Sequence, residues 1–289
     1  MSPSSPPSKW TLFGGVGLAV VAISFAAILI RLADAPAVAV AFWRNFFGTL
    51  FLLPFAVLRR QQFPKGRIRV GAILAGCALA AHFGLWITSL DFTSVASSVV
   101  LVCTQPVFVA LFAWLFLKEK ISRTAATGIF IAVVGTFLIG TDYTFGQHAL
   151  LGNMLALAGA VAIAIYVLLG RWIRTEGTTI LPYAVVVYGT ASVVLALVCF
   201  STGAQMFGYS AQTWLCLILI TLGPQIMGHT VFNWALRFVK APILSGTILL
   251  EPVLSTLFAW AILSETPVMT SLVGGAVILV GLALVIRGR

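Results

Sequence analysis

The chain has 289 residues, of which 61% are hydrophobic and only 8% are charged, and its formal net charge is +10. A soluble domain carries roughly 25% charged residues because it needs a polar exterior. The composition therefore excludes an ordinary soluble protein and indicates a chain that lies largely within a lipid bilayer. The four cysteines lie singly in apolar runs, without a CxxC or metal-ligand spacing, so we expect neither disulfides nor a metal site.

Ten apolar runs predict ten membrane-spanning helices, since each span needs about 20 mostly apolar residues. Residues 1–9, MSPSSPPSK, are predicted to form a disordered cytoplasmic tail. The next run is too long for the core of a signal peptide, so we interpret it as a first helix that remains in the protein. The predicted spans are residues 10–31, 37–58, 68–90, 94–117, 121–140, 150–172, 179–201, 212–235, 241–263 and 267–286.

The basic residues predict the orientation of these spans. If the N-terminus is cytoplasmic, 15 of the 17 Lys and Arg residues fall in cytoplasmic segments, and only Arg31 and Arg44 do not. The positive-inside rule describes such a bias. We therefore expect an integral protein of a bacterial inner membrane, with both termini in the cytoplasm. Topology and anionic lipid explain the positive charge, so we expect no nucleic-acid partner.

The second half of the chain repeats the first. The segment QPVFVALFAWLFLKEK at 105–120 matches EPVLSTLFAWAILSET at 251–266, at an offset of 146 residues. The matched helices are the fourth and fifth spans in one half and the ninth and tenth in the other. A repeat of five helices is odd-numbered, so the second copy must be inverted in the membrane. Inverted repeats are typical of secondary transporters, whose substrate sites lie at the repeat interface.

The fold that we predict is therefore an all-α polytopic membrane protein, with ten transmembrane helices arranged as two inverted five-helix repeats. The repeats are expected over residues 10–144 and 145–289. At the same offset Gly128 matches Gly274. Gly135 likewise matches Gly281. We expect these glycines to allow close helix packing.

Motifs in both halves point to one family. They are Gln105-Pro106, LFAW at 111–114, Glu119, Gly128 and Gly135 in the first half; Glu251-Pro252, LFAW at 257–260, Glu265, Gly274, Gly275 and Gly281 in the second; and the opening stretch ISFAAILIRLADAPAVAVAFWRN at 23–45. With these motifs the sequence resembles the EamA-type permeases, the ten-helix family of the drug/metabolite transporter superfamily. The resemblance covers nearly the whole chain. It implies a polytopic carrier, commonly an exporter of amino acids, metabolites or drugs, with a central cavity.

Two charged residues within spans are candidate site residues, because charge in the hydrocarbon is costly. Arg44 could bind a substrate carboxylate, pair with Glu251, or snorkel to the outer interface. Glu251 precedes Pro252, which is expected to kink the ninth helix and open carbonyl groups to a cavity. Glu251 could couple transport to protons or cations, or it could only hold its helix in place. Gln105 takes the equivalent position in the first half, so the two halves differ chemically.

Helix nine carries two hydroxyl residues at four-residue spacing from the glutamate. Thr247, Glu251 and Ser255 should therefore share one face, which we expect to line the cavity. The alternative is that the Thr and Ser hydroxyls bond back to their own helix.

Helices three and eight, which are repeat equivalents, carry histidines. Helix three offers His82 and Trp86, while helix eight offers Gln225, His229 and Asn233. These side chains could face the cavity from opposite sides, where the histidines could shuttle protons. They could also be packing residues. The Trp86 ring could stack on a flat substrate.

The sequence contains no nucleophile elbow, Walker loop or zinc-protease motif, so we expect a transporter rather than an enzyme. The function that we predict is secondary-active transport of small organic solutes by alternating access, specifically export of amino acids or related metabolites. A membrane-embedded enzyme, a receptor and a lipid flippase remain as alternatives. The expected partners are a small-molecule substrate, the lipid bilayer and coupled protons, without a cofactor. A monomer and a homodimer are both compatible with the sequence.

Overall fold

The computed structural model describes residues 7–93, 95–139, 149–263 and 269–288, and these residues form helices and turns without strands. Most of the tail predicted over residues 1–9 lies outside the described residues. Its last residue, Lys9, already belongs to the first helix, because the Ser8 hydroxyl caps that helix by accepting a hydrogen bond from the Thr11 N–H at 3.1 Å. The predicted boundary between the two halves, at residues 144 and 145, and the motif residue Glu265 also lie outside the described residues.

The first half contains five apolar spans, two of them interrupted. Their helices are α1 (Lys9–Ser24) with α2 (Ala26–Leu32), α3 (Ala37–Leu58), α4 (Gly66–Ser89), α5 (Val95–Val102) with α6 (Gln105–Leu117), and α7 (Arg123–Ile139). The first span breaks at Phe25, and the fourth breaks at the residues before Gln105-Pro106. A proline within the first turn of a helix is tolerated, since the N–H groups there have no helical partner in any case.

The second half follows the same order. Its helices are α8 (Ala149–Thr175), α9 (Ile180–Thr202), α10 (Ala211–Ile220) continued by a π-helical segment η1 (Thr221–Thr230) and α11 (Val231–Ala235), α12 (Ala241–Gly246) continued by a 3₁₀ segment η2 (Thr247–Leu250) and α13 (Glu251–Leu263), and α14 (Met269–Arg287). The eighth span is π-helical around Pro224, and the ninth changes helix type directly before Glu251-Pro252. Each irregularity lies beside a proline, which removes a helical hydrogen bond.

The number of spans agrees with the sequence. Within the described residues, nine helices or interrupted helices are long and apolar enough to cross a membrane, and Arg123–Leu138 is a shorter apolar helix. Together they account for the ten predicted spans, so the predicted fold class is confirmed. Many large apolar side chains face outward from this bundle, among them Phe55, Phe116 and Phe200. A lipid environment accommodates such a surface, whereas water would not.

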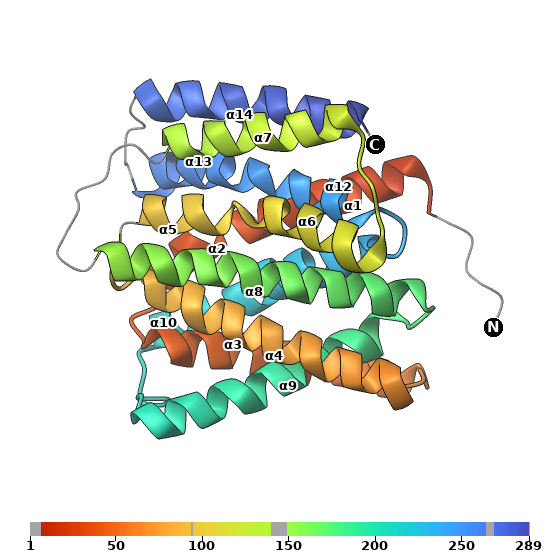
Figure 1. Cartoon of the computed structure of the whole chain (residues 1–289). Helices are drawn as coiled ribbons and strands as arrows, with labels where there is room; N and C mark the ends of the chain where they lie inside the picture. The colour runs from red at the N-terminus through yellow and green to blue at the C-terminus, as the bar shows by residue number, and fades with distance from the viewer. Residues whose placement is uncertain (1–6, 94, 140–148, 264–268, 289) are drawn as a thin grey trace.

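The helices α7 and α14, which are repeat equivalents, pack along each other (Figure 1). Their contacts show how the two halves are related. A Cβ atom on Gly128 would lie 2.6 Å from the carbonyl oxygen of Gly281, and one on Gly135 would lie 2.7 Å from that of Gly274. The partners run in opposite order along the chain, so the two helices are antiparallel. Because Gly128 corresponds to Gly274 and Gly135 to Gly281, each contact is the counterpart of the other. Such self-matching contacts define a two-fold interface, which confirms the predicted inverted repeat.

One end of the bundle collects the basic loops, and we call it the basic end. It comprises residues 59–69, 118–123, 171–177, 237–241 and 287–288. Figure 1 shows α1 beginning and α14 ending on the same side. Polar contacts tie the basic loops together, including Lys240 Nζ to the carbonyl oxygen of Lys120 at 3.1 Å and an exposed ion pair between Arg67 and Glu176 at 3.3 Å. The clustering of these basic loops at one end of the bundle agrees with the distribution of Lys and Arg in the sequence.

Candidate functional site

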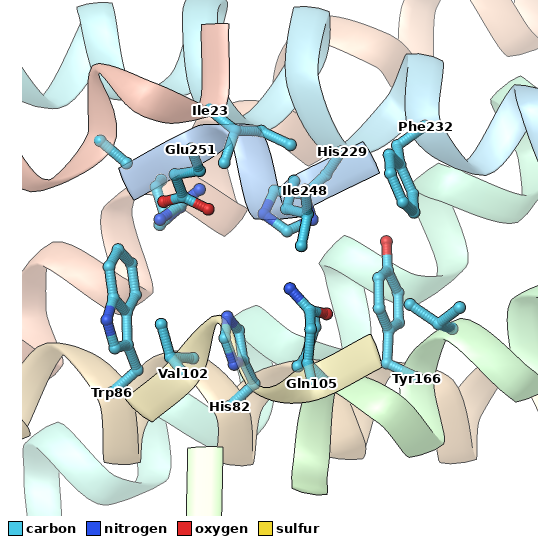
Figure 2. Close-up of a pocket in the computed structure, with 14 residues that line it drawn as sticks. Ile23, His82, Trp86, Val102, Gln105, Tyr166, His229, Phe232, Ile248 and Glu251 are labelled. Atoms are coloured by element: carbon cyan, nitrogen blue, oxygen red, sulfur yellow. The ribbon is translucent and has the colours of Figure 1, made fainter. Parts of the chain in front are cut away.

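A cavity lies in the middle of the bundle, between the two halves (Figure 2). Its wall is built from Ile23, Ala26, Arg44, His82, Trp86, Val102, Gln105, Ile163, Tyr166, Val167, His229, Phe232, Ile248 and Glu251. The space open to the centres of water-sized molecules is about 40 Å³. At roughly 10–15 Å³ for each water, this volume holds about three waters. The cavity is therefore narrow in this conformation, and a solute larger than a few waters could bind only if the walls moved apart.

Helix interruptions bring polar groups to this cavity. Gln105 is the first residue of α6 and Glu251 is the first residue of α13, and each directly precedes a proline. His229 lies in the π-helical segment η1. Irregular helical turns in membrane proteins occur where they line a cavity, since elsewhere their backbone groups would face lipid. The two repeat-related breaks thus face the same space from opposite halves, which is the arrangement described for secondary transporters.

Arg44 lies on the cavity wall and is fully buried. Its Nε donates to the side-chain Oε1 of Gln225 at 2.9 Å, and its guanidinium carbon lies 3.8 Å from the ring centre of Phe83. Among the residues that the structure describes, its Nη1 has no hydrogen-bond partner. Of the three alternatives for Arg44, snorkelling to the interface is excluded by this placement.

Glu251 lies on the wall of the same cavity as Arg44, but the two side chains do not form an ion pair. Within the described part of the chain, the ion pairs are Arg67–Glu176 and Arg171–Glu119. The contact recorded for the Glu251 carboxylate is the Cys103 thiol, whose Sγ lies 3.8 Å from Oε2. Cys103 is one of the four cysteines that lie singly in apolar runs, and it was not a predicted site residue. Its position two residues before Gln105-Pro106 was the signal that could have placed it opposite Glu251.

The two histidines lie on opposite walls, as their repeat-related positions predicted (Figure 2). Their ring centres are 6.5 Å apart. The His82 ring stacks on Trp86, with centres 5.8 Å apart and planes inclined by 8°, and its Nδ1 lies 3.0 Å from the carbonyl oxygen of Gly159. Gly159 permits this close approach, because a Cβ there would lie 3.3 Å from that of Trp86. The His82 imidazole is therefore held in one orientation at the cavity wall.

Asn233 lies behind the wall and not on it. Its Nδ2 donates to the Tyr166 hydroxyl at 2.6 Å and to the carbonyl oxygen of His229 at 2.7 Å. Tyr166 does line the cavity. Tyr166 could not be predicted from the sequence, because an uncharged hydroxyl in a long apolar helix carries no distinctive signal. Within the described residues, Asn233 thus reaches the cavity wall through its contacts with Tyr166 and His229.

The prediction that Thr247 and Ser255 line the cavity together with Glu251 is wrong. The Thr247 hydroxyl donates to the carbonyl oxygen of Leu244 at 2.6 Å, and the Ser255 hydroxyl donates to that of Ser24 at 3.0 Å. The predicted common face assumed α-helical geometry throughout. The segment from Thr247 to Leu250 is instead a 3₁₀ helix with three residues per turn, which rotates Thr247 away from the face of Glu251.

Comparisons with known proteins agree with this architecture. The profile of the EamA-like transporter family matches residues 8–141 and 150–287. The uncharacterized transporter YdfC of Bacillus subtilis (strain 168) is 25% identical over 82% of this chain and 78% of its own length. The pseudopaline exporter CntI of Pseudomonas aeruginosa (strain UCBPP-PA14) is 25% identical over 93% of this chain and 94% of its own length.

A solved structure supports the fold. One crystal structure matches with a TM-score of 0.81 at 17% identity, covering 98% of this chain and 99% of the matched chain. Both repeats of the family profile fall on the two halves that the structure relates by inversion. The chain belongs to the EamA-like transporter family.

Proposed function

We propose that this membrane transporter is a secondary-active exporter of amino acids or related metabolites, which it moves by alternating access. The observation that carries the proposal is the central cavity between the inverted halves, in which Arg44 and Glu251 lie without an ion pair between them. A buried charge is costly unless something pairs with it. A solute that carries both a carboxylate and an ammonium group would supply a partner to each.

The direction of transport is inferred from a relative. CntI is named as an exporter, and it matches this chain over nearly its full length. The basic end is assigned to the cytoplasm, since the positive-inside rule places clustered Lys and Arg there. Export then means loading from the basic end and release at the opposite one.

Coupling to protons is assigned to Glu251. A carboxylate in the membrane interior costs on the order of 3 kcal/mol, and protonation or a bound cation lowers that cost. If the inward-open and outward-open states offer Glu251 different partners, proton binding shifts the balance between them. His82 and His229, on the two walls, are further candidates to carry protons.

Purified protein in liposomes tests the function. The liposomes would be preloaded with members of a panel of amino acids and related metabolites, and release would be followed with chemical analysis of the solute on both sides. Transport predicts that at least one zwitterionic solute moves and remains chemically unchanged. A changed solute would indicate an enzyme, movement of labelled lipid alone a flippase, and binding without movement a receptor. Any of these three results would overturn the proposal.

A further inference from the structure

We propose that Gln225 is a positioning residue, which presents Arg44 as the binding point for a carboxylate group of the solute. The inference rests on the proposed function, because it assigns a substrate group to the same cavity. Gln225 itself does not line the cavity, and no side-chain atom of it needs to touch the solute. Its role is to hold the Arg44 guanidinium in one direction while leaving the positive charge uncompensated.

A chain of hydrogen bonds determines the orientation of the Gln225 amide. Asn45 Nδ2 donates to the carbonyl oxygen of Ala41 at 2.8 Å, so its Oδ1 is left to accept. Gln225 Nε2 donates to that Oδ1 at 3.1 Å, so Oε1 of Gln225 is directed at Arg44 and accepts from its Nε at 2.9 Å. The two side-chain amides can form this chain of hydrogen bonds in only one orientation, because an amide oxygen accepts and an amide N–H donates.

The backbone of Gln225 is fixed as well. Its carbonyl oxygen accepts from the Tyr188 hydroxyl at 3.2 Å and from the Thr230 hydroxyl at 3.3 Å. Gln225 directly follows Pro224 within the π-helical segment η1, whose wider turns displace the helix locally. Gly48 allows the close approach, since a Cβ there would lie 3.2 Å from the Tyr188 ring and 3.4 Å from Gln225 Cγ. Gln225 is fully buried, so water does not compete for these contacts.

The Arg44 guanidinium is therefore held in place by contacts along its Nε edge and against one of its two flat faces. Gln225 holds the Nε edge, and the Phe83 ring lies against the face at 3.8 Å. Nη1 is buried and has no hydrogen-bond partner within the described part of the chain. A buried, unpaired and charged donor calls for an acceptor, and a carboxylate is the acceptor that a guanidinium matches best. The neutral amide at position 225 matters here, because it orients Arg44 and leaves the positive charge of the guanidinium uncompensated. A glutamate at this position would orient Arg44 too, but it would cancel that charge.

Three variants test the inference. Gln225→Glu should place a compensating charge on Arg44, and Gln225→Met keeps the length of the side chain while removing the hydrogen bonds. Gln212→Glu is the matched control, since Gln212 lies on the same span but is exposed. The measurement is counterflow of a solute that wild type transports, compared with the amide analogue of that solute. We expect Gln225→Glu to lower the preference for the carboxylate form about tenfold or more, since a charged hydrogen bond is worth about that factor.

The expected pattern separates positioning from a merely structural role. Gln225→Met should raise KM for the carboxylate solute with little change in the maximal rate, while Gln212→Glu should behave as wild type. Equal losses for the carboxylate and amide forms, or an unchanged preference in Gln225→Glu, would overturn the inference. If wild type transports nothing, the proposed function fails separately. Thermal stabilisation of the detergent-purified protein by propionate, compared with propionamide, then tests the site. A propionate-specific shift in wild type that Gln225→Glu lacks supports the inference, and equal shifts overturn it.

Discussion

At the scale of single residues, we propose that the buried charge of Arg44 carries substrate recognition. Arg44→Ala removes the guanidinium, and we expect transport of a carboxylate-bearing solute to fall at least tenfold, since charged hydrogen bonds in a buried site are worth about 1.5–3 kcal/mol. Arg44→Lys keeps the charge but loses the planar fork that contacts Gln225, so it should recover only part of the activity. Uptake in liposomes, at matched amounts of folded protein, measures both. Wild-type transport by Arg44→Ala would refute the assignment.

Glu251 is the residue to which we assign proton coupling. Glu251→Gln keeps the shape of the side chain and mimics its protonated form. We expect net transport to lose its pH dependence, while exchange of solute for solute continues, because exchange needs no change in proton occupancy. Parallel assays of net flux and of exchange across a series of pH values would show this difference. If the variant keeps full pH-dependent net flux, Glu251 is structural, and coupling must be sought at His82 or His229.

The sequence identified the charged part of the site better than the uncharged part. Arg44 and Glu251 could be predicted because a charge within a span is rare and needs a reason. Tyr166 could not, since a hydroxyl among apolar residues is also compatible with simple packing. Cys103 was not predicted, although its position two residues before Gln105-Pro106 could have placed it opposite Glu251. The face of Thr247 on the ninth helix was predicted wrongly, because a 3₁₀ segment changes the angular spacing that the sequence alone suggests is α-helical. Ser255 lies in α13 with Glu251, but its hydroxyl bonds to the first span.

At the scale of secondary-structure elements, the pairing of α7 with α14 depends on glycine. A Cβ on Gly281 would lie 2.6 Å from the backbone nitrogen of Ala132 and from the carbonyl oxygen of Gly128. Neither backbone atom can move aside alone, so Gly281→Ala should destabilise the protein by roughly 1–3 kcal/mol. Gly17→Ala is the control, because a Cβ there meets nothing within 4 Å. Thermal unfolding in detergent should show a lower midpoint for the first variant only.

The loop after α6 joins the two halves at the basic end. Arg171 Nε donates to Glu119 Oε1 at 2.7 Å, and the Ala241 N–H donates to the other carboxylate oxygen at 3.1 Å. At the opposite end, Phe25 stacks on Phe258 with ring centres 4.1 Å apart. Thus the first span contacts the ninth, and the fourth contacts the sixth, at opposite ends of the cavity. These are repeat-related pairs of helices, and alternating access requires each pair to separate in turn.

Glu119→Gln should therefore open the basic end more often. Cys103, which contacts Glu251, can report this opening in a background that lacks Cys77, Cys199 and Cys216. A membrane-impermeant thiol reagent applied from the basic end should label Cys103 faster in Glu119→Gln than in the parent. Glu176→Gln is the control, since its ion pair with Arg67 is exposed and contributes little. Equal labelling rates in parent and Glu119→Gln would show that this contact does not hold the end closed.

At the scale of the whole molecule, the two-fold repeat could be read from the sequence because it leaves a long, ungapped match. The offset between Gln105 and Glu251, with an odd number of helices, predicted the inversion that the glycine contacts confirm. The breaks in the first and eighth spans could not be predicted as readily. Phe25 has no helix-breaking chemistry, and Pro224 could equally have produced a simple kink, so tertiary packing decides the local helix type.

The orientation in the membrane is a prediction that stays open to test. The start of α1 and the end of α14 lie at the same end of the bundle, together with the basic loops (Figure 1). We expect this end to be cytoplasmic, because clustered Lys and Arg resist translocation. Reporter fusions after residue 289 and within residues 59–69 should both report the cytoplasm. A periplasmic signal from either position would contradict the assigned topology.

Counterflow in proteoliposomes tests the central claim most directly, namely that one cavity is exposed alternately to the two sides. Vesicles loaded with an excess of unlabelled zwitterionic solute would be diluted into a trace of the labelled form. A carrier of this kind predicts that the label accumulates transiently above its external concentration and then declines, because inward and outward movements share one site. Arg44→Ala should abolish the overshoot. Simple equilibration of the label without an overshoot, or an overshoot unaffected by Arg44→Ala, would contradict transport through the cavity described above.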